Sequence, residues 1–198
     1  MHLDLLELPM PITLRTAAPV SDQDLILFAE RNKPYKVERN REGEITIMTP
    51  VGGIGSTHEA YVAAMLYIWA NQDGRGMALG PNAGFNLPDG SCLAPDACWF
   101  EQKRWTQLTP EQQAGFLPFC PDFVIEIRSQ SDSRRLLETK MKLWLENGAQ
   151  LAWLIDPQNA SITIYRSVES EQTIIRPFHV EAGPPVSGFV LKTLPLWP

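Results

Sequence analysis

The order of apolar and polar positions predicts helices and strands along most of the chain. Two stretches are typical of helices because apolar residues return every three or four positions. The first covers residues 21–32, with Ser21 as N-cap and Asp24 at the capping-box position. The second covers residues 57–72 and follows Ser56, which can cap it. A third helix is expected before Asn147-Gly148, a pair typical of a helix end.

Short runs rich in β-branched and aromatic residues, bounded by turn residues, predict strands. These runs are residues 35–38, 45–48, 77–80, 83–87, 92–100, 121–128, 151–156 and 161–166, followed by shorter strands in the tail. Pro88-Asp89-Gly90 is a strong turn signal, so the runs on either side of it should pair as a hairpin. A polar, partly helical insertion is expected at residues 101–120.

The order of these elements predicts an α/β fold. The strand 121–128, the helix after it and the strand 151–156 form a strand-helix-strand unit, whose two strands run parallel inside a sheet. With the remaining strands, this gives a mixed central sheet flanked by helices, with extra N- and C-terminal strands. We expect one domain over residues 1–198, in which residues 1–20 form an extended arm.

Charged residues interrupt the strand 121–128 in a regular way. Alternate residues of a strand share a face, so Phe123, Ile125 and Ile127 lie on one side. Asp122, Glu126 and Arg128 lie on the other. A carboxylate inside such a sheet costs several kcal/mol unless it is paired or holds a metal. The strand therefore indicates either a buried ion pair or a metal site.

The following helix carries a lysine among its apolar residues. Lys140 faces the sheet and lies about eight residues into the helix, roughly 12 Å along it at about 1.5 Å per residue. Glu126 lies about three residues before the end of its strand, roughly 10 Å back at about 3.3 Å per residue, so the two are level. Asp122 is too far from Glu126, roughly 13 Å, to share a cation with it. Asp96, expected on a neighbouring strand, is the better partner.

Two carboxylates that converge from adjacent strands suit a hard divalent cation such as Mg²⁺, with Mn²⁺ as a substitute. We therefore consider Asp96 and Glu126 as metal ligands, and Lys140 as the cation that stabilises charge developing on a phosphate. Each has an alternative interpretation. Glu126 would pair with Arg128 or Lys140, Asp96 would start a turn or accept from backbone N–H groups, and Lys140 would extend its amine to solvent.

Two residues of the second helix are further candidates. His58 faces inward, where a hydrogen-bonded packing role is the ordinary expectation, and Glu59 is an acid beside it. We treat both as supporting residues of the candidate site.

Composition limits these hypotheses. The chain has 198 residues, 44% of them hydrophobic, which is enough for one core. The net charge of −6 argues against a protein held on nucleic acid by overall charge, although a local basic groove is compatible with it. Three cysteines without Cys-x-x-Cys spacing favour reduced thiols and a cytoplasmic protein. No apolar run reaches the roughly 18 residues of a membrane span, so no membrane partner is expected.

The order Pro95-Asp96, Glu126, then a lysine resembles the PD-(D/E)XK nuclease signature, with its lysine moved to the following helix. More closely, residues 20–157 resemble the restriction-endonuclease family known as Uma-two. The motifs are YKVERNREGEITIMTPVGG, THEAYVAAML, FNLPDG, LAPDACWF, PDFVIEIRSQSD, K-x3-W-x3-G and AWLIDP.

This resemblance implies a restriction-endonuclease-like fold and a Mg²⁺-dependent endonuclease acting on DNA. It implies Asp96 and Glu126 as metal ligands, Lys140 as the catalytic lysine, and Asp122 as a supporting residue. Glu59 would be the acid of the first helix in this class. Cleavage of both DNA strands needs two active sites, which favours a homodimer.

One position departs from the signature. Arg128 stands where the strand lysine is expected, and an arginine binds phosphate but does not act as a base near neutral pH. We therefore treat Arg128 as a supporting residue of the candidate site. An alternative is therefore a catalytically inactive nuclease-fold module that binds DNA or protein. The net charge of −6 and the absence of a recognisable DNA-reading motif favour this alternative.

Overall fold

The structure is a computed structural model that describes residues 10–166 and 171–197. Its centre is a six-stranded sheet with the order β11-β10-β9-β8-β7-β4. In that order the strands are Gln172–Ile175, Ser161–Arg166, Leu151–Asp156, Phe123–Ile127, Ala97–Glu101 and Gly76–Leu79. β8 and β9 are parallel, and the other neighbours are antiparallel. The predicted mixed central sheet is confirmed.

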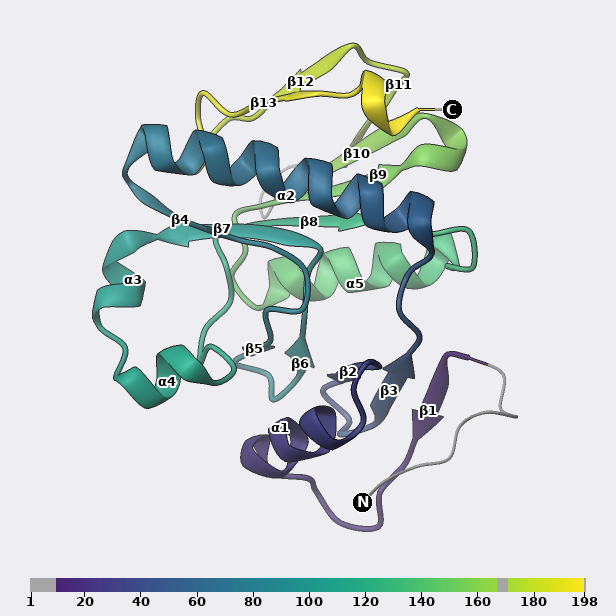
Figure 1. Ribbon diagram of the computed structural model, residues 1–198, viewed down its shortest axis with the longest axis vertical. Helices are drawn as coiled ribbons and strands as arrows, with labels where there is room; N and C mark the ends of the chain where they lie inside the picture. Colours follow the sequence, from purple (N-terminus) through teal and green to yellow (C-terminus); the bar gives the residue numbers. More distant parts are fainter. Residues whose placement is uncertain (1–9, 167–170, 198) are drawn as a thin grey trace.

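Two long helices cover the two faces of this sheet (Figure 1). α5 (Arg134–Glu146) connects the parallel strands β8 and β9, as the strand-helix-strand pattern predicted. α2 (Gly53–Asp73) lies on the opposite face. The prediction that Ser56 caps α2 is wrong, because the N–H of Ser56 already donates to the carbonyl of Gly52, the true N-cap, at 2.9 Å.

The pattern of strand β8 is reproduced in the core. Phe123, Ile125 and Ile127 pack in the cluster that includes Val62 and Leu66 of α2. Val124 points the other way, into the cluster that contains Met141 and Trp144 of α5. Because strand residues alternate, Glu126 shares the face of Val124 and so faces α5.

A second sheet, with the order β1-β3-β2-β6-β5, lies beside the first (Figure 1). Its strands are Ile12–Leu14, Ile45–Met48, Lys36–Arg39, Cys92–Leu93 and Phe85–Asn86. α1 (Asp22–Arg31) packs against it, and the Ser21 side chain accepts from the N–H of Asp24 at 3.1 Å, which confirms the predicted cap. The predicted arm 1–20 is corrected in part, since β1 pairs with β3, while residues 1–9 lie outside the described residues.

The run 92–100, expected as one strand, is divided between the two sheets. β6 pairs with β5 across the predicted turn, where Gly90 has φ 86° and its N–H donates to Leu87 at 3.0 Å. β7 joins the central sheet instead. Pro95 has no N–H for a strand ladder, which favours a break at this point. The break places Asp96 at the junction of the two sheets.

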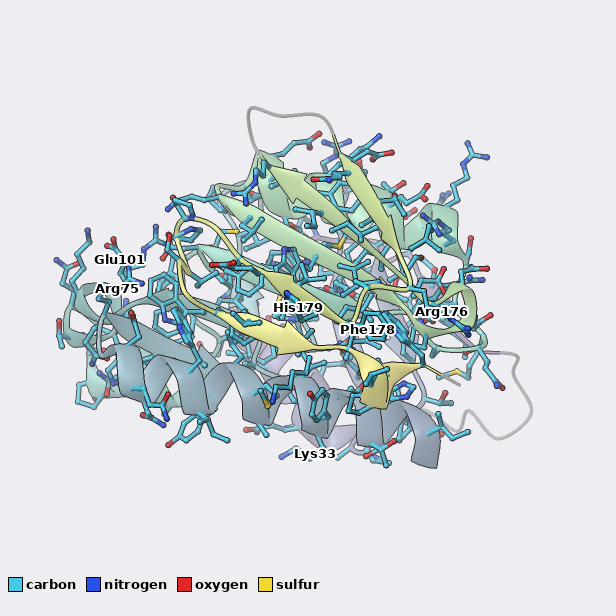
Figure 2. The ribbon with its side chains drawn as sticks, turned by 90° about the horizontal axis from the view of Figure 1, so that it is seen from above. Lys33, Arg75, Glu101, Arg176, Phe178 and His179 are labelled. Carbon is cyan, nitrogen blue, oxygen red and sulfur yellow. The ribbon has the colours of Figure 1, made fainter. Side chains whose placement is uncertain are left out.

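The insertion forms two short helices, and the tail forms a small hairpin. The helices are α3 (Gln102–Thr106) and α4 (Pro110–Ala114), and the 3₁₀ turns are η1 (Pro157–Asn159) and η2 (Leu194–Leu196). The hairpin pairs β12 (His179–Glu181) with β13 (Val190–Lys192) and crosses the sheet alongside α2 (Figure 2). None of the helices in the described ranges combines the length and hydropathy of a membrane span.

Candidate active site

Asp96 and Glu126 come together at one end of the β7–β8 pair. The register places Ala97 opposite Ile125, so Asp96 and Glu126 are the next positions on the two strands. The N–H of Asp96 donates to the carbonyl of Ile125 at 3.1 Å, and Asp96 Oδ2 accepts from the N–H of Ile127 at 2.8 Å. Both carboxyl groups are buried, Asp96 at 7% and Glu126 at 2% exposure. The two acids therefore lie side by side at this strand end, as their expected strand neighbourhood implied, and they define the acidic site.

Helix α5 brings a cation and a hydrogen-bond donor to the same acidic site. Lys140 Nζ lies 2.9 Å from Glu126 Oε1, and Trp144 Nε1 donates to that oxygen at 2.9 Å. Residues four apart share a helix face, which is why both reach the same carboxylate. Lys140 does not extend its amine into bulk water, since its side chain is only 15% exposed.

The second sheet contributes two residues that sequence reasoning missed. Glu38 Oε1 lies 2.8 Å from Lys140 Nζ and accepts from the N–H of Ala94 at 3.1 Å. Lys36 Nζ lies 3.5 Å from Asp96 Oδ1 and 3.9 Å from Glu38 Oε1. Lys36 and Glu38 alternate on one face of β2. In the sequence, this alternation looks like an ordinary solvent face, so it does not mark a site.

The pKa values reflect this crowded arrangement. Burial raises the pKa of Glu126 to about 7, while Lys140 acts against the rise and Asp96 adds to it. Burial also acts to raise the pKa of Glu38, but Lys140 and Lys36 outweigh it and leave the pKa below its ordinary value. Burial acts to lower the pKa of Lys140, yet Glu126 and Glu38 raise it above its ordinary value. Lys140 is therefore a permanent cation, and Glu126 is the acid that a further positive charge would keep ionised.

Glu59 of α2 belongs to the same electrostatic group, whereas His58 does not. Burial, with a contribution from the charge of Asp96, raises the pKa of Glu59 to about 6, while Lys36 opposes the rise. His58 has a lowered pKa through partial burial alone. Within the described part of the chain, no hydrogen bond or ion pair joins His58 to these acids. Of the two α2 candidates, Glu59 is the one whose pKa responds to the charges of Asp96 and Lys36.

Asp122 lies at the other end of β8 and takes part in a separate network. Its Oδ2 accepts from the N–H of Glu101 at 3.0 Å. Its Oδ1 accepts from Gln150 Nε2 at 3.2 Å and lies 3.0 Å from Arg104 Nη2. These contacts join the end of β7 to β8. Asp122 therefore holds these strands together and does not support the acidic site.

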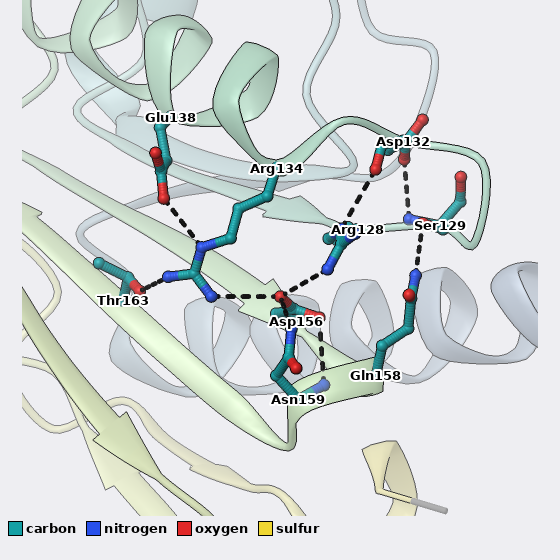
Figure 3. A network of polar contacts seen from close by, with 9 residues as sticks. All are labelled: Arg128, Ser129, Asp132, Arg134, Glu138, Asp156, Gln158, Asn159 and Thr163. Atoms are coloured by element: carbon teal, nitrogen blue, oxygen red, sulfur yellow. Dashed lines mark hydrogen bonds and ion pairs between the residues drawn. The ribbon is translucent and has the colours of Figure 1, made fainter.

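Arg128 is directed toward Asp156 and the loop before α5 (Figure 3). Its Nη1 lies 3.0 Å from Asp156 Oδ2, and its Nε donates to the carbonyl of Asp132 at 3.2 Å. Asp156 is shared with Arg134, whose Nη1 lies 3.3 Å away. The expectation that Arg128 supports the carboxylates, or pairs with Glu126, is therefore corrected. The guanidinium stabilises the ends of β8 and β9 and the loop before α5.

The donor set fits a cation held by few protein ligands. Across residues 10–166 and 171–197, no group of three or more acidic, histidine or cysteine side chains has a metal-holding arrangement. In the same ranges, the hydrogen bonds and ion pairs of Glu126 go to Oε1 and leave Oε2 available. Among the described residues, Asp96 Oδ1 has only the 3.5 Å contact with Lys36. Mg²⁺ is commonly bound by one or two carboxylates with several waters, so Asp96 and Glu126 suit it.

The fold and site define a class before they define a family. A mixed sheet between two helices, with two carboxylates and a lysine converging at one strand end, is a restriction-endonuclease-like arrangement. A family model described as "Putative restriction endonuclease" matches residues 22–192, and the chain belongs to this Uma2 family. This membership supports a nuclease function.

A solved structure confirms the fold. The crystal structure of "a putative nuclease belonging to DUF820" from Anabaena variabilis ATCC 29413 is similar, with a TM-score of 0.73 and 21% identity. The match covers 90% of this chain and 98% of that one. A cryoEM structure of a DrdV–DNA complex matches at a TM-score of 0.41 and 10% identity, over 77% of this chain and 11% of the other, which is too distant to support an argument. Comparison with curated proteins found no match.

Proposed function

We propose that this protein is a Mg²⁺-dependent endonuclease that hydrolyses phosphodiester bonds of DNA. The observation that carries the proposal is the contact of Lys140 with Glu126, next to Asp96. The lysine comes from α5, the helix after the strand, while Arg128 occupies the strand position and points elsewhere. Membership of a restriction-endonuclease family supports the same activity.

Each residue has a defined task in this proposal. Asp96 and Glu126 would hold the cation, and a bound Mg²⁺ would supply charge neutralisation and a more acidic water. Lys140 and Trp144 fix Glu126 in place and favour its ionised form. In the reaction, the water oxygen bonds to phosphorus and one phosphorus–oxygen ester bond breaks. The water gives up a proton, and the leaving oxygen takes one.

The test is cleavage of supercoiled plasmid with Mg²⁺ or Mn²⁺. Wild type should nick or linearise the plasmid, and Lys140→Ala should lose about 10- to 100-fold in rate, the range expected when a group that orients a metal ligand is removed. Lys142→Ala is the matched control, because Lys142 is exposed on the same helix. Equal rates for Lys140→Ala and wild type, or a wild type inactive with both metals, would refute the proposal.

An inactive nuclease-fold module that binds DNA or protein is the second candidate. The observation that favours it is that Lys140 is already tied to Glu38 and Glu126, which gives a self-sufficient buried ion network. It predicts a wild type that binds without cleaving. The cleaving enzyme, in contrast, is expected to be a homodimer with one active site for each DNA strand. Light scattering measures whether the protein is a dimer.

A further inference from the structure

The two lysines of the site differ in how many of their hydrogen-bond donors are used. A lysine ammonium group carries three N–H donors. Lys140 Nζ lies 2.8 Å from Glu38 Oε1, 2.9 Å from Glu126 Oε1 and 3.4 Å from the carbonyl of Ala94. These three acceptors, one for each donor, all belong to the protein. Lys140 therefore has no donor left for a substrate.

Lys36 is held much more loosely. Its two ion pairs, with Asp96 Oδ1 at 3.5 Å and Glu38 Oε1 at 3.9 Å, are longer than the roughly 2.7–2.9 Å of a charge-assisted hydrogen bond. Its side chain is 20% exposed, against 15% for Lys140. Lys36 thus lies beside the oxygen of Asp96 that is available to a cation, with donors still unused.

The acidic charge around the site favours an ammonium group that faces the substrate. Glu38, Asp96 and Glu126 carry up to three negative charges against the two of Lys36 and Lys140, and Glu59 adds a fourth acid. A phosphodiester is itself an anion, so these acids repel it. An ammonium group with unused donors at the edge of the acidic group offsets this repulsion and binds phosphate oxygen.

We propose that Lys36, from the second sheet, contacts the phosphate group that is cleaved, and that Lys140 is a positioning residue for Glu126. This inference rests on the proposed endonuclease function. It assigns the metal-binding acids to the central sheet and the substrate-facing cation to the hairpin β2–β3. The active site is then complete only when the two sheets pack together.

The test compares how DNA binding depends on salt. Binding of a short duplex is followed by fluorescence anisotropy over a series of KCl concentrations, with Ca²⁺ in place of Mg²⁺. Loss of one phosphate contact lowers the slope of log K against log salt by about 0.9. Lys36→Met should show this loss, together with a fall of at least about 100-fold in single-turnover cleavage with Mg²⁺. Lys36→Arg should keep the slope, because arginine also binds phosphate.

Lys192→Met is the matched control for charge. Lys192 is exposed on β13, on the α2 side of the central sheet, whereas Glu126 faces α5. Its removal should leave both slope and rate unchanged. Lys140→Met should lower the melting temperature and the cleavage rate but keep the slope, as expected for a residue that does not touch DNA.

The outcomes separate this inference from the proposed function. An unchanged slope in Lys36→Met, or a wild type with no salt-dependent DNA binding, overturns the inference. A lower slope in Lys36→Met with a wild type that binds but does not cleave supports Lys36 as the phosphate contact and refutes the endonuclease. Lys36→Gln, which keeps a polar side chain, replaces Lys36→Met under the same criteria if the methionine variant does not fold.

Discussion

The two ends of strand β8 each carry a buried carboxylate, yet the two carboxylates are held in different ways. Asp122 is 1% exposed and Glu126 is 2% exposed. Both oxygens of Asp122 have partners, from a backbone N–H, an amide and Arg104. The partners of Glu126, Lys140 and Trp144, both contact Oε1.

This difference shows that burial alone does not identify a functional acid. A carboxylate with both oxygens satisfied is stable as an anion and has no capacity left for a ligand. Burial raises the pKa of Glu126 to about 7 against the opposing effect of Lys140, and because one of its oxygens is available, this carboxylate gains from an added cation. Asp122 therefore holds strands together, whereas Glu126 is suited to binding a cation.

The largest expected effect is on metal binding at the Glu126 end. Calorimetric titration of wild type with Mn²⁺ should give one ion per chain, and Glu126→Ala should abolish binding, a loss of at least about 100-fold when one of two carboxylate ligands is removed. Asp122→Asn should bind Mn²⁺ like wild type. Equal affinities in Glu126→Ala and wild type would end the distinction between the two ends of the strand.

The next effect is on folding, at the Asp122 end. Asp122→Asn removes an acceptor and leaves Arg104 without its buried partner, so the free energy of unfolding should fall by about 2–4 kcal/mol. Urea denaturation measures this change. Glu101→Gln is the control, because the Glu101 side chain pairs with Lys103 in the open and its loss should not move the midpoint. A stable Asp122→Asn that no longer binds Mn²⁺ would contradict a purely structural role.

The smallest effect concerns Glu59 and is a change in how stability depends on pH. Its pKa is raised from 4.5 to about 6 in the folded state, so the folded chain binds more protons between these pH values. The favourable contribution of its protonated form is complete below pH 4.5 and is lost as the pH rises through about 6.

Glu59→Gln should therefore gain stability over wild type as the pH increases from about 4.5 to 7.5. Because Glu59 is partly exposed, we expect less than about 1 kcal/mol. Urea midpoints at several pH values measure it. Parallel pH profiles for the variant and wild type would place Glu59 outside the electrostatic group at the Glu126 end.

The sequence alone determined which residues share a face of one strand or one helix. Alternation along β8 and the helical period of α5 placed Glu126 and Lys140 on facing surfaces, and the structure brings them to 2.9 Å. The expectation that the strand with Asp96 neighbours β8 is also met, because β7 pairs with β8. These predictions worked because backbone geometry alone determines which residues of one strand or one helix share a face.

Only the tertiary structure decided the other half of the site. Glu38 contacts Lys140 across 102 positions of the chain, and Lys36 contacts Asp96 across 60. Arg128, at the strand position where the signature has a lysine, turned instead to Asp156. Periodicity determines the face that a residue occupies but not the surface that later packs against it. That depends on how the two sheets join, which is a balance of burial and charge over the whole chain.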